Sequence, residues 1–164
     1  MKIYLIGFMG SGKTTIGRYL AKELGFDFVD TDRFIEMQQE MTIAEIFSQH
    51  GESAFREMEH KLLLDLNNSN STVVSTGGGM PCYNDNMNIM LANGKVAYLK
   101  TSPQTLAQRL IFSQDKRPLI RGKTEPELLQ FITDQLLKRE PVYNRANITV
   151  ETENFSIEEI LNSL

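Results

Sequence analysis

The chain has 164 residues, of which 41% are hydrophobic and 23% are charged, so it can bury a core and is not intrinsically disordered. Its 17 basic and 21 acidic side chains give a net charge of −4, which argues against a nucleic-acid partner. We expect no membrane partner and no signal peptide, because no apolar run is long enough and residue 2 onward already resembles a strand. A single cysteine, Cys82, excludes an internal disulfide and favours a reduced, cytoplasmic setting.

The first predicted unit is a strand over residues 2–6, a glycine-rich loop, and a helix that ends at Gly25. The loop, Gly7-Phe8-Met9-Gly10-Ser11-Gly12-Lys13-Thr14, fits the pattern G-x-x-x-x-G-K-[ST]. Glycines let the backbone approach a polyphosphate, and successive N–H groups then face it at the positive end of the helix. We expect Lys13 to reach the β- and γ-phosphates of a nucleoside triphosphate and the Thr14 hydroxyl to ligate Mg²⁺.

A second strand, over residues 26–29, ends in Asp30-Thr31-Asp32. On an extended chain the two carboxylates point the same way, toward the bound phosphates. One of them can hold the hydration shell of Mg²⁺, and the other can meet a substrate hydroxyl. Asp32 also fits the N-cap of a helix predicted over residues 32–39, and capping is compatible with catalysis.

Three glycines, Gly77-Gly78-Gly79, follow a compact strand over residues 72–75. They cost conformational entropy and pack nothing, which makes sense where a ligand touches the backbone. A flexible turn is the alternative interpretation. Their position after a buried strand favours the ligand.

The remaining predicted elements continue the alternation of strands and helices. Together they predict an α/β fold whose parallel sheet is covered on both faces, with ligands at the carboxyl ends of the strands. Residues 113–123 are polar, basic and non-periodic, which is typical of a mobile loop. We expect helices over 42–51 (opened by a capping box), 53–66, 86–91, from Pro103 after the N-cap Ser102, from Thr124 to about Arg139, and from 156, and strands over 95–99 and 147–151.

Three arginines are candidates for anion recognition. Arg56 lies early in a helix, Arg117 lies in the 113–123 loop, and Arg139 precedes Pro141. Taken singly, each is best interpreted as a solvated surface residue. Arginine is nevertheless the preferred side chain for forked recognition of carboxylate or phosphate groups.

Six segments together closely resemble the shikimate kinase family over nearly the whole chain. The phosphate loop alone is shared with many kinases, whereas the combination of Asp-Thr-Asp, the triple glycine and Arg-x-Pro-x-Tyr is far more specific. The segments are Gly7 to Thr15, Phe28-Val29-Asp30-Thr31-Asp32, Ala54-Phe55-Arg56, Gly77-Gly78-Gly79, Arg117-Pro118-Leu119 and Arg139-Glu140-Pro141-Val142-Tyr143.

This resemblance implies a three-layer sandwich with a five-stranded parallel sheet, a P-loop kinase of the nucleoside monophosphate kinase type. It implies a single domain over residues 1–164 with a lid at about 113–123, and a monomer. The implied reaction is ATP-dependent phosphorylation of the 3-hydroxyl of shikimate, with Mg²⁺, in chorismate and aromatic amino-acid biosynthesis.

The family's site residues carry over to matching positions. The resemblance implies substrate contacts from Asp32, Arg56, Gly78 and Arg139, and catalytic roles for Lys13, Asp32 and Arg117. The residues implied for ATP are Gly10, Ser11, Gly12, Lys13, Thr14 (also on Mg²⁺), Thr15, Arg109 (against adenine) and Arg117 (from the lid). Where the family often has another arginine near adenine, residues 152–155 have none, so the adenine contacts there stay open.

Two alternatives remain at this stage. One is another small-molecule kinase of the same fold, such as a gluconate or nucleotide kinase, against which the triple glycine and Arg-x-Pro-x-Tyr argue. The other is a nucleotide-binding regulatory module without transfer activity. The complete set of Lys13, Thr14, Asp32 and Arg117 argues against it.

Overall fold

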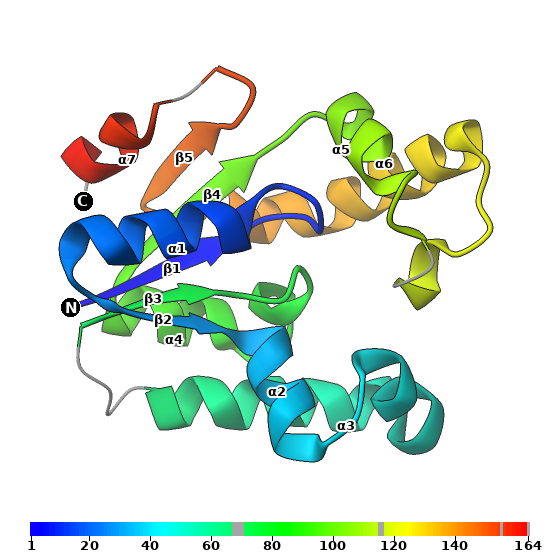
Figure 1. The fold of residues 1–164 in the computed structure, drawn as a ribbon, viewed down its shortest axis with the longest axis horizontal. Coiled ribbons are helices and arrows are strands. Elements are labelled where there is room, and N and C mark those ends of the chain that lie inside the picture. The colour runs from blue at the N-terminus through cyan, green and yellow to red at the C-terminus, as the bar shows by residue number, and fades with distance from the viewer. Residues whose placement is uncertain (67–70, 115–116, 155, 164) are drawn as a thin grey trace.

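Five parallel strands form the centre of the computed structural model, which describes residues 1–66, 71–114, 117–154 and 156–163 (Figure 1). β1 lies in the middle, and its Tyr4 pairs with Val74 on one side and Val96 on the other. Because strands buried on both faces need covering on both faces, this arrangement fixes a three-layer architecture. The strands in spatial order are β2 (Asp27–Asp30), β3 (Thr72–Ser75), β1 (Lys2–Ile6), β4 (Lys95–Lys100) and β5 (Ile148–Glu151).

Helices cover both faces of the sheet, with α1 and α7 on one side and α3 to α6 on the other (Figure 1). Alternate residues of β1 divide between the two cores: Ile3 and Leu5 pack toward α1 and α7, whereas Tyr4 and Ile6 pack toward the larger group. The helices are α1 (Lys13–Leu24), α2 (Thr31–Gln39), α3 (Ile43–Leu66), α4 (Asn86–Asn93), α5 (Pro103–Leu110), α6 (Glu125–Tyr143) and α7 (Ile157–Ser163), with short 3₁₀ turns η1 (Met80–Cys82) and η3 (Pro118–Ile120).

The predicted fold class is confirmed, and several predicted boundaries are confirmed with it. Gly25 ends α1 in the left-handed region, and the side chains of Ser102 and Thr124 cap α5 and α6. The two helices expected on either side of Gly51 form one element, α3, which is kinked at that residue (φ 83°, ψ 167°). The predicted interruption of the helix at Gly51 is therefore confirmed.

Two boundary predictions were wrong. Asp30 ends β2, but Thr31 and Asp32 already belong to α2, so the two carboxylates do not lie on an extended chain. α6 does not end near Arg139 but continues through Pro141 to Tyr143. The proline costs one helical hydrogen bond, but the carbonyl concerned belongs to Leu137, which lies on the exposed side of the helix where water can replace the bond.

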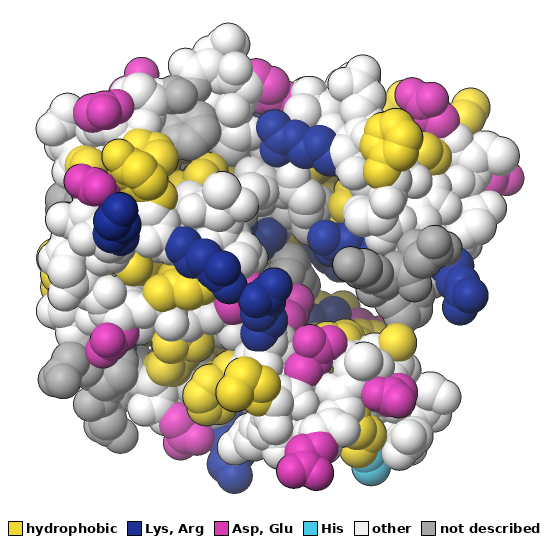
Figure 2. Space-filling model, in the orientation of Figure 1, with side chains coloured by type: hydrophobic (Ala, Val, Ile, Leu, Met, Phe, Trp, Pro, Cys, Tyr) yellow, Lys and Arg dark blue, Asp and Glu magenta, His cyan; other side chains and the backbone are white. Residues whose placement is uncertain are grey.

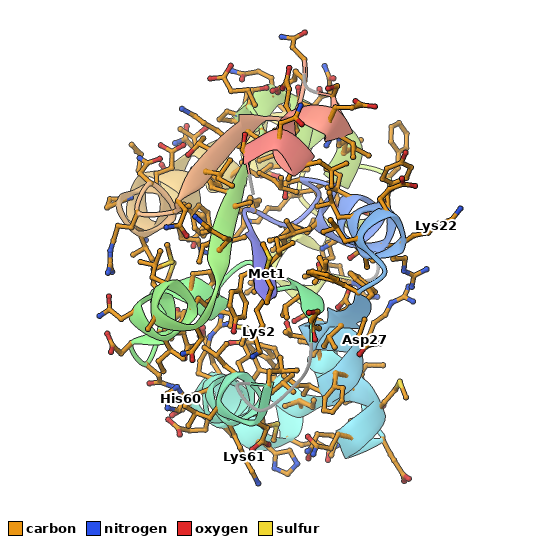
Figure 3. All side chains as sticks on the ribbon, turned by 90° about the vertical axis from the view of Figure 1, so that its left-hand side faces the viewer. Met1, Lys2, Lys22, Asp27, His60 and Lys61 are labelled. Carbon is orange, nitrogen blue, oxygen red and sulfur yellow. The ribbon has the colours of Figure 1, made fainter. Side chains whose placement is uncertain are left out.

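The segment 113–123, expected to be a loop, contains η3, and its Ile120 is fully buried in the larger core. Residues 115 and 116 of this segment lie outside the described ranges, as do Phe155 and Leu164. Figure 3 views the molecule from the edge of the sheet at which the strands begin, where Met1, Lys2 and Asp27 are labelled. Within the described ranges, no helix is both long and apolar enough to cross a membrane.

Candidate active site

The loop between β1 and α1 is held in a tight curve at the carboxyl edge of the sheet. Gly7, Gly10 and Gly12 adopt φ values of 144°, 82° and 97°, which other residues rarely tolerate. Lys13 begins α1, and its Nζ donates to the carbonyl oxygens of Gly7 (2.8 Å) and Phe8 (2.9 Å). The buried ammonium group thus fixes the loop whose N–H groups and helix terminus favour an anion.

The other residues predicted to bind ATP differ in their burial and contacts. Ser11 is buried, whereas Thr15 is exposed in the first turn of α1. Arg109, from the last turn of α5, donates from Nη1 to the Gly10 carbonyl at 3.0 Å. The position predicted to meet adenine therefore lies directly against the phosphate loop.

Thr14 and Asp30 join the ends of two neighbouring elements. The Thr14 hydroxyl donates to Asp30 Oδ2 at 2.7 Å, while Asp30 Oδ1 accepts the Arg33 N–H and caps α2. Asp30, rather than Asp32, is therefore the cap. In the described part of the chain, no three His, Cys, Asp or Glu side chains gather as a metal cage. One hydroxyl and one carboxylate beside a phosphate loop nevertheless fit Mg²⁺, which keeps several waters and binds mainly through phosphates.

Gly77, Gly78 and Gly79, here called the glycine strap, follow β3 and bring three parts of the site into contact. A methyl group added at Gly78 would lie 3.4 Å from Arg139 Nη1, from the Gly7 carbonyl oxygen and from the Met9 nitrogen. The strap therefore touches the phosphate loop and an arginine of α6 at one point. This packing argues against the alternative interpretation of the three glycines as a flexible turn.

The other two glycines are packed still more tightly against functional side chains. A methyl group at Gly77 would lie 2.6 Å from Asp32 Oδ1 and 2.7 Å from Glu59 Oε1, and one at Gly79 would lie 2.6 Å from Arg56 Nη2. A side chain at either position would have to displace these carboxyl or guanidinium groups. Asp32, Arg56 and Arg139, which are far apart in sequence, thus all border the same three residues.

Arg56 is held in one orientation by three neighbours. Its Nη1 donates to Glu59 at 2.7 Å, its Nη2 donates to Glu52 at 3.1 Å, and its guanidinium lies 4.2 Å from the centre of the Tyr83 ring. A pre-ordered guanidinium fork is suited to a carboxylate ligand. The Arg139 guanidinium, which lies near Gly78 of the same strap, is 5.4 Å from the centre of the Phe8 ring.

The carboxyl groups of Asp32 and Glu59 are unusual in their protonation. Burial, together with the charge of Asp30, raises the pKa of Asp32 to about 6. Burial raises the pKa of Glu59 to about 7 against the opposing effect of Arg56. Asp32 Oδ1 and Glu59 Oε1 are buried without a hydrogen-bond partner among the described residues. Perturbed, unpaired carboxyl groups at a sheet's carboxyl edge are typical of functional sites.

The pKa values of two cationic side chains, Lys13 and Arg117, are shifted as well. Burial lowers the pKa of Lys13 to about 8, with Asp32 opposing and Arg117 adding to this effect. Burial also lowers the pKa of Arg117, which Asp32 opposes. Arg117, Lys13 and Asp32 therefore act on one another. Figure 2 shows a hollow on this face, on the right-hand side, with Lys and Arg side chains along its rim and Asp and Glu side chains beside it.

Glu59 and Tyr143 were missed as site residues by sequence reasoning. Glu59 follows Arg56 by three residues, a spacing that also suits an ordinary surface ion pair. A signal was present, because Glu59 is one turn after Phe55 and one turn before Leu62, and apolar residues at this spacing indicate the inward face of a helix. Tyr143 was noted only as part of a motif, and its hydroxyl donates to the Gly78 carbonyl at 2.5 Å.

Comparisons with known proteins agree with this geometry. The shikimate kinase family model matches residues 9–164. The chain is 42% identical to the shikimate kinase of Parabacteroides distasonis, over 96% of this chain and 91% of that protein. Both matches extend over nearly all of the sequence.

Solved structures are similar over the same extent. The crystal structure of shikimate kinase from Bacteroides thetaiotaomicron superposes with a TM-score of 0.91 at 37% identity, covering 99% of this chain and 94% of that chain. Shikimate kinase from Acinetobacter baumannii in complex with shikimate gives a TM-score of 0.88 at 36% identity, covering 98% and 88%. With a phosphate loop, a glycine strap and two arginines arranged as described, the chain belongs to the shikimate kinase family.

Proposed function

We propose that this chain transfers the γ-phosphoryl group of ATP to the 3-hydroxyl of shikimate, giving shikimate 3-phosphate and ADP. One observation carries the proposal: the glycine strap borders Asp32, Arg56 and Arg139 while also touching the phosphate loop. An anion-binding pair of arginines and a triphosphate-binding loop thus open onto one place. Such a site suits an acceptor that bears both a carboxylate and hydroxyl groups.

The acceptor is held through its negative charge. Arg56 and Arg139 bind the shikimate carboxylate, and the backbone of Gly78 meets the ring hydroxyls. Arg56 is only 8% exposed, and a buried guanidinium is costly unless it is fully compensated. Glu59 and Glu52 supply part of that compensation, and an anionic substrate supplies more.

Asp32 orients the attacking hydroxyl and accepts its proton. Phosphoryl transfer has a loose transition state, so positioning and charge stabilisation matter more than early removal of the proton. With a pKa of about 6, Asp32 is ionised at neutral pH and is a better proton acceptor than an ordinary aspartate. Lys13 and Arg117 stabilise the charge that develops on the phosphoryl oxygens.

Mg²⁺ fits beside Thr14 and Asp30, where it would neutralise phosphate charge and help to orient the triphosphate. Gly10 to Thr15 and Arg109 bind the nucleotide. The segment 113–123 acts as a lid that carries Arg117 over the site and limits hydrolysis by water. We propose that the enzyme is a cytoplasmic monomer and takes part in chorismate and aromatic amino-acid biosynthesis.

An acceptor screen tests this function directly. ADP release is measured with shikimate, gluconate, a nucleoside monophosphate or no acceptor, each at equal concentration with MgATP. Shikimate-dependent release is expected, with phosphate found on the 3-hydroxyl by NMR. If ADP were released with gluconate or the nucleotide but not with shikimate, that compound would be the substrate instead. Equal release without any acceptor would indicate an ATPase.

Arg139→Ala is expected to raise the KM for shikimate by about 10- to 100-fold, because a charge-assisted contact to the carboxylate is lost. The KM for ATP should change little. Steady-state kinetics with each substrate varied in turn make the measurement. Lys138→Ala, which removes an exposed cation from the preceding position of α6, is the matched control. A change confined to the KM for ATP would contradict the carboxylate assignment.

Arg117→Ala is expected to lower kcat by about 10²-fold, while shikimate affinity changes much less. The reason is that Arg117 acts on the same space as Lys13 and Asp32, where charge moves during transfer. Steady-state kcat, with shikimate binding by calorimetry, separates the two effects. Arg121→Ala alters an exposed arginine of the same segment and should leave kcat unchanged. Unaltered turnover in Arg117→Ala would exclude this role.

A further inference from the structure

Tyr143 lies beside the glycine strap, the part of the site that we assign to the acceptor. It is the last residue of α6 and follows Arg139 by one helical turn, so both side chains project from one face of the helix. Its side chain is fully buried, and its ring packs against that of Tyr98 with centroids 5.0 Å apart. Its hydroxyl donates to the carbonyl oxygen of Gly78 at 2.5 Å.

The Gly78 carbonyl differs from its neighbours in the glycine strap. The carbonyls of Gly77 and Gly79 accept the N–H groups of Met80 and Cys82 in the turn that follows. The Gly78 carbonyl instead accepts a side-chain hydroxyl from a distant helix. The orientation of this one peptide is therefore set by α6 and not by the local turn.

The end of α6 is consistent with such a task. Pro141 interrupts the hydrogen bonding of the helix, so helix propensity does not account for the extra residues beyond it. The contacts of Tyr143 with Tyr98 and Gly78 stabilise the continuation of the helix. Both Arg139 and the tyrosine hydroxyl thereby meet the strap at Gly78.

We propose that Tyr143 is a positioning residue for the acceptor: its hydroxyl fixes the Gly78 peptide at the distance from Arg139 that shikimate requires. The inference rests on the function proposed above. Tyr143 does not touch the reacting atoms but acts through Gly78. One hydroxyl group thereby links the backbone that meets the ring hydroxyls to the helix that supplies a carboxylate-binding arginine.

The chemistry of the hydroxyl suits this role. Burial raises the pKa of Tyr143 above its usual value, so the phenol is protonated and is a hydrogen-bond donor at neutral pH. The charge of the Arg139 guanidinium also acts on the same hydroxyl, and it opposes the effect of burial. Loss of the oxygen would leave the Gly78 carbonyl without this donor.

Tyr143→Phe tests the proposal, because it removes one oxygen and keeps the ring. We expect the KM for shikimate, and its Kd from calorimetry without ATP, to rise by about tenfold. The kcat and the KM for ATP should stay within about twofold of wild type, because the phosphate loop keeps its own bonds from Lys13.

Tyr98→Phe is the matched control. Tyr98 is equally buried, packs against the same ring, and donates to Glu140 of the same helix at 3.3 Å, but does not contact the strap through its hydroxyl. It should leave the KM and Kd for shikimate within about twofold of wild type. All assays are made well below the unfolding temperature of each variant, so that lost stability does not imitate lost binding.

Three outcomes would overturn the inference. The first is an unchanged KM and Kd for shikimate in Tyr143→Phe. The second is an equal loss of shikimate affinity in Tyr98→Phe, which would indicate general loosening of the core. The third is wild-type protein that neither binds nor phosphorylates shikimate, which would refute the proposed function itself and this inference with it.

Discussion

Lys13→Ala is expected to lower kcat by about 10³-fold, the loss that follows when a buried charge-stabilising group is removed from a phosphoryl-transfer site. Lys13 is only 8% exposed and is held by two carbonyls of the loop, so its ammonium is pre-oriented and water does not substitute for it readily. With a pKa of about 8 it is charged at neutral pH. The wild-type kcat/KM for ATP should therefore also fall as the pH rises through about 8.

Steady-state kinetics with MgATP varied at saturating shikimate make the measurement. Lys22→Ala, which removes an exposed lysine from the last turn of α1, is the control and should be fully active. Thermal unfolding of both variants shows whether the loop carbonyls need their donor for stability. Near-normal turnover by a folded Lys13→Ala protein would remove this residue from the mechanism.

Asp32→Asn is expected to lower kcat by about 10²- to 10⁴-fold, because an amide cannot accept the proton of the attacking hydroxyl. Shikimate binding should weaken much less, since a side chain of the same shape remains beside Gly77. In the wild type, the kcat/KM for shikimate should fall as the pH drops below about 6, where Asp32 takes up a proton. Asp65→Asn, at an exposed position of α3, is the control. Equal activity of the two variants would exclude Asp32 as the acceptor of the proton.

The same substitution should raise stability. The pKa of Asp32 rises from 3.8 to about 6 on folding, so the folded state binds this proton more tightly than the unfolded chain. The protonated carboxyl thus favours folding fully below about pH 3.8, and this contribution is lost progressively as the pH rises to about 6. At pH 8 the penalty amounts to at most about 3 kcal/mol. Asp32→Asn should therefore unfold several degrees higher than wild type at pH 8, and the difference should fall to about half at pH 5, which lies between the two pKa values.

Calorimetric scans at the two pH values test this. Asp65→Asn should match wild type at both. A wild-type protein that is more stable than Asp32→Asn at pH 8 would show that the Asp32 charge is compensated within the fold, contrary to the electrostatics of the site.

Local chemistry explains which parts of the fold the sequence predicted. The phosphate loop was recognisable because its glycines need positive φ values, and the ends of α1, α5 and α6 were recognisable from Gly25, Ser102 and Thr124. In each case one or two adjacent residues decide the backbone. Such features require no knowledge of the tertiary structure.

Contacts across the molecule explain the errors. The start of α2 was misjudged because Asp30, bonded to Thr14 on α1, is the residue that caps it. The end of α6 was misjudged because Tyr143 gains contacts with Gly78 and Tyr98 that outweigh the effect of Pro141. Neither partner lies near the misjudged residue in sequence. The burial of Glu59 against Gly77 is of the same kind.

The tight packing of the glycine strap has a consequence for drug resistance. A methyl group at Gly77 or Gly79 would collide with Asp32 and Glu59 or with Arg56, so these positions tolerate no larger side chain without displacing groups that the reaction needs. A point mutation at these positions could not block an inhibitor that hydrogen-bonds to this backbone without also lowering the activity of the enzyme. Escape mutations against such a compound should therefore arise elsewhere, for instance at Leu119 or Arg121, whose side chains are exposed.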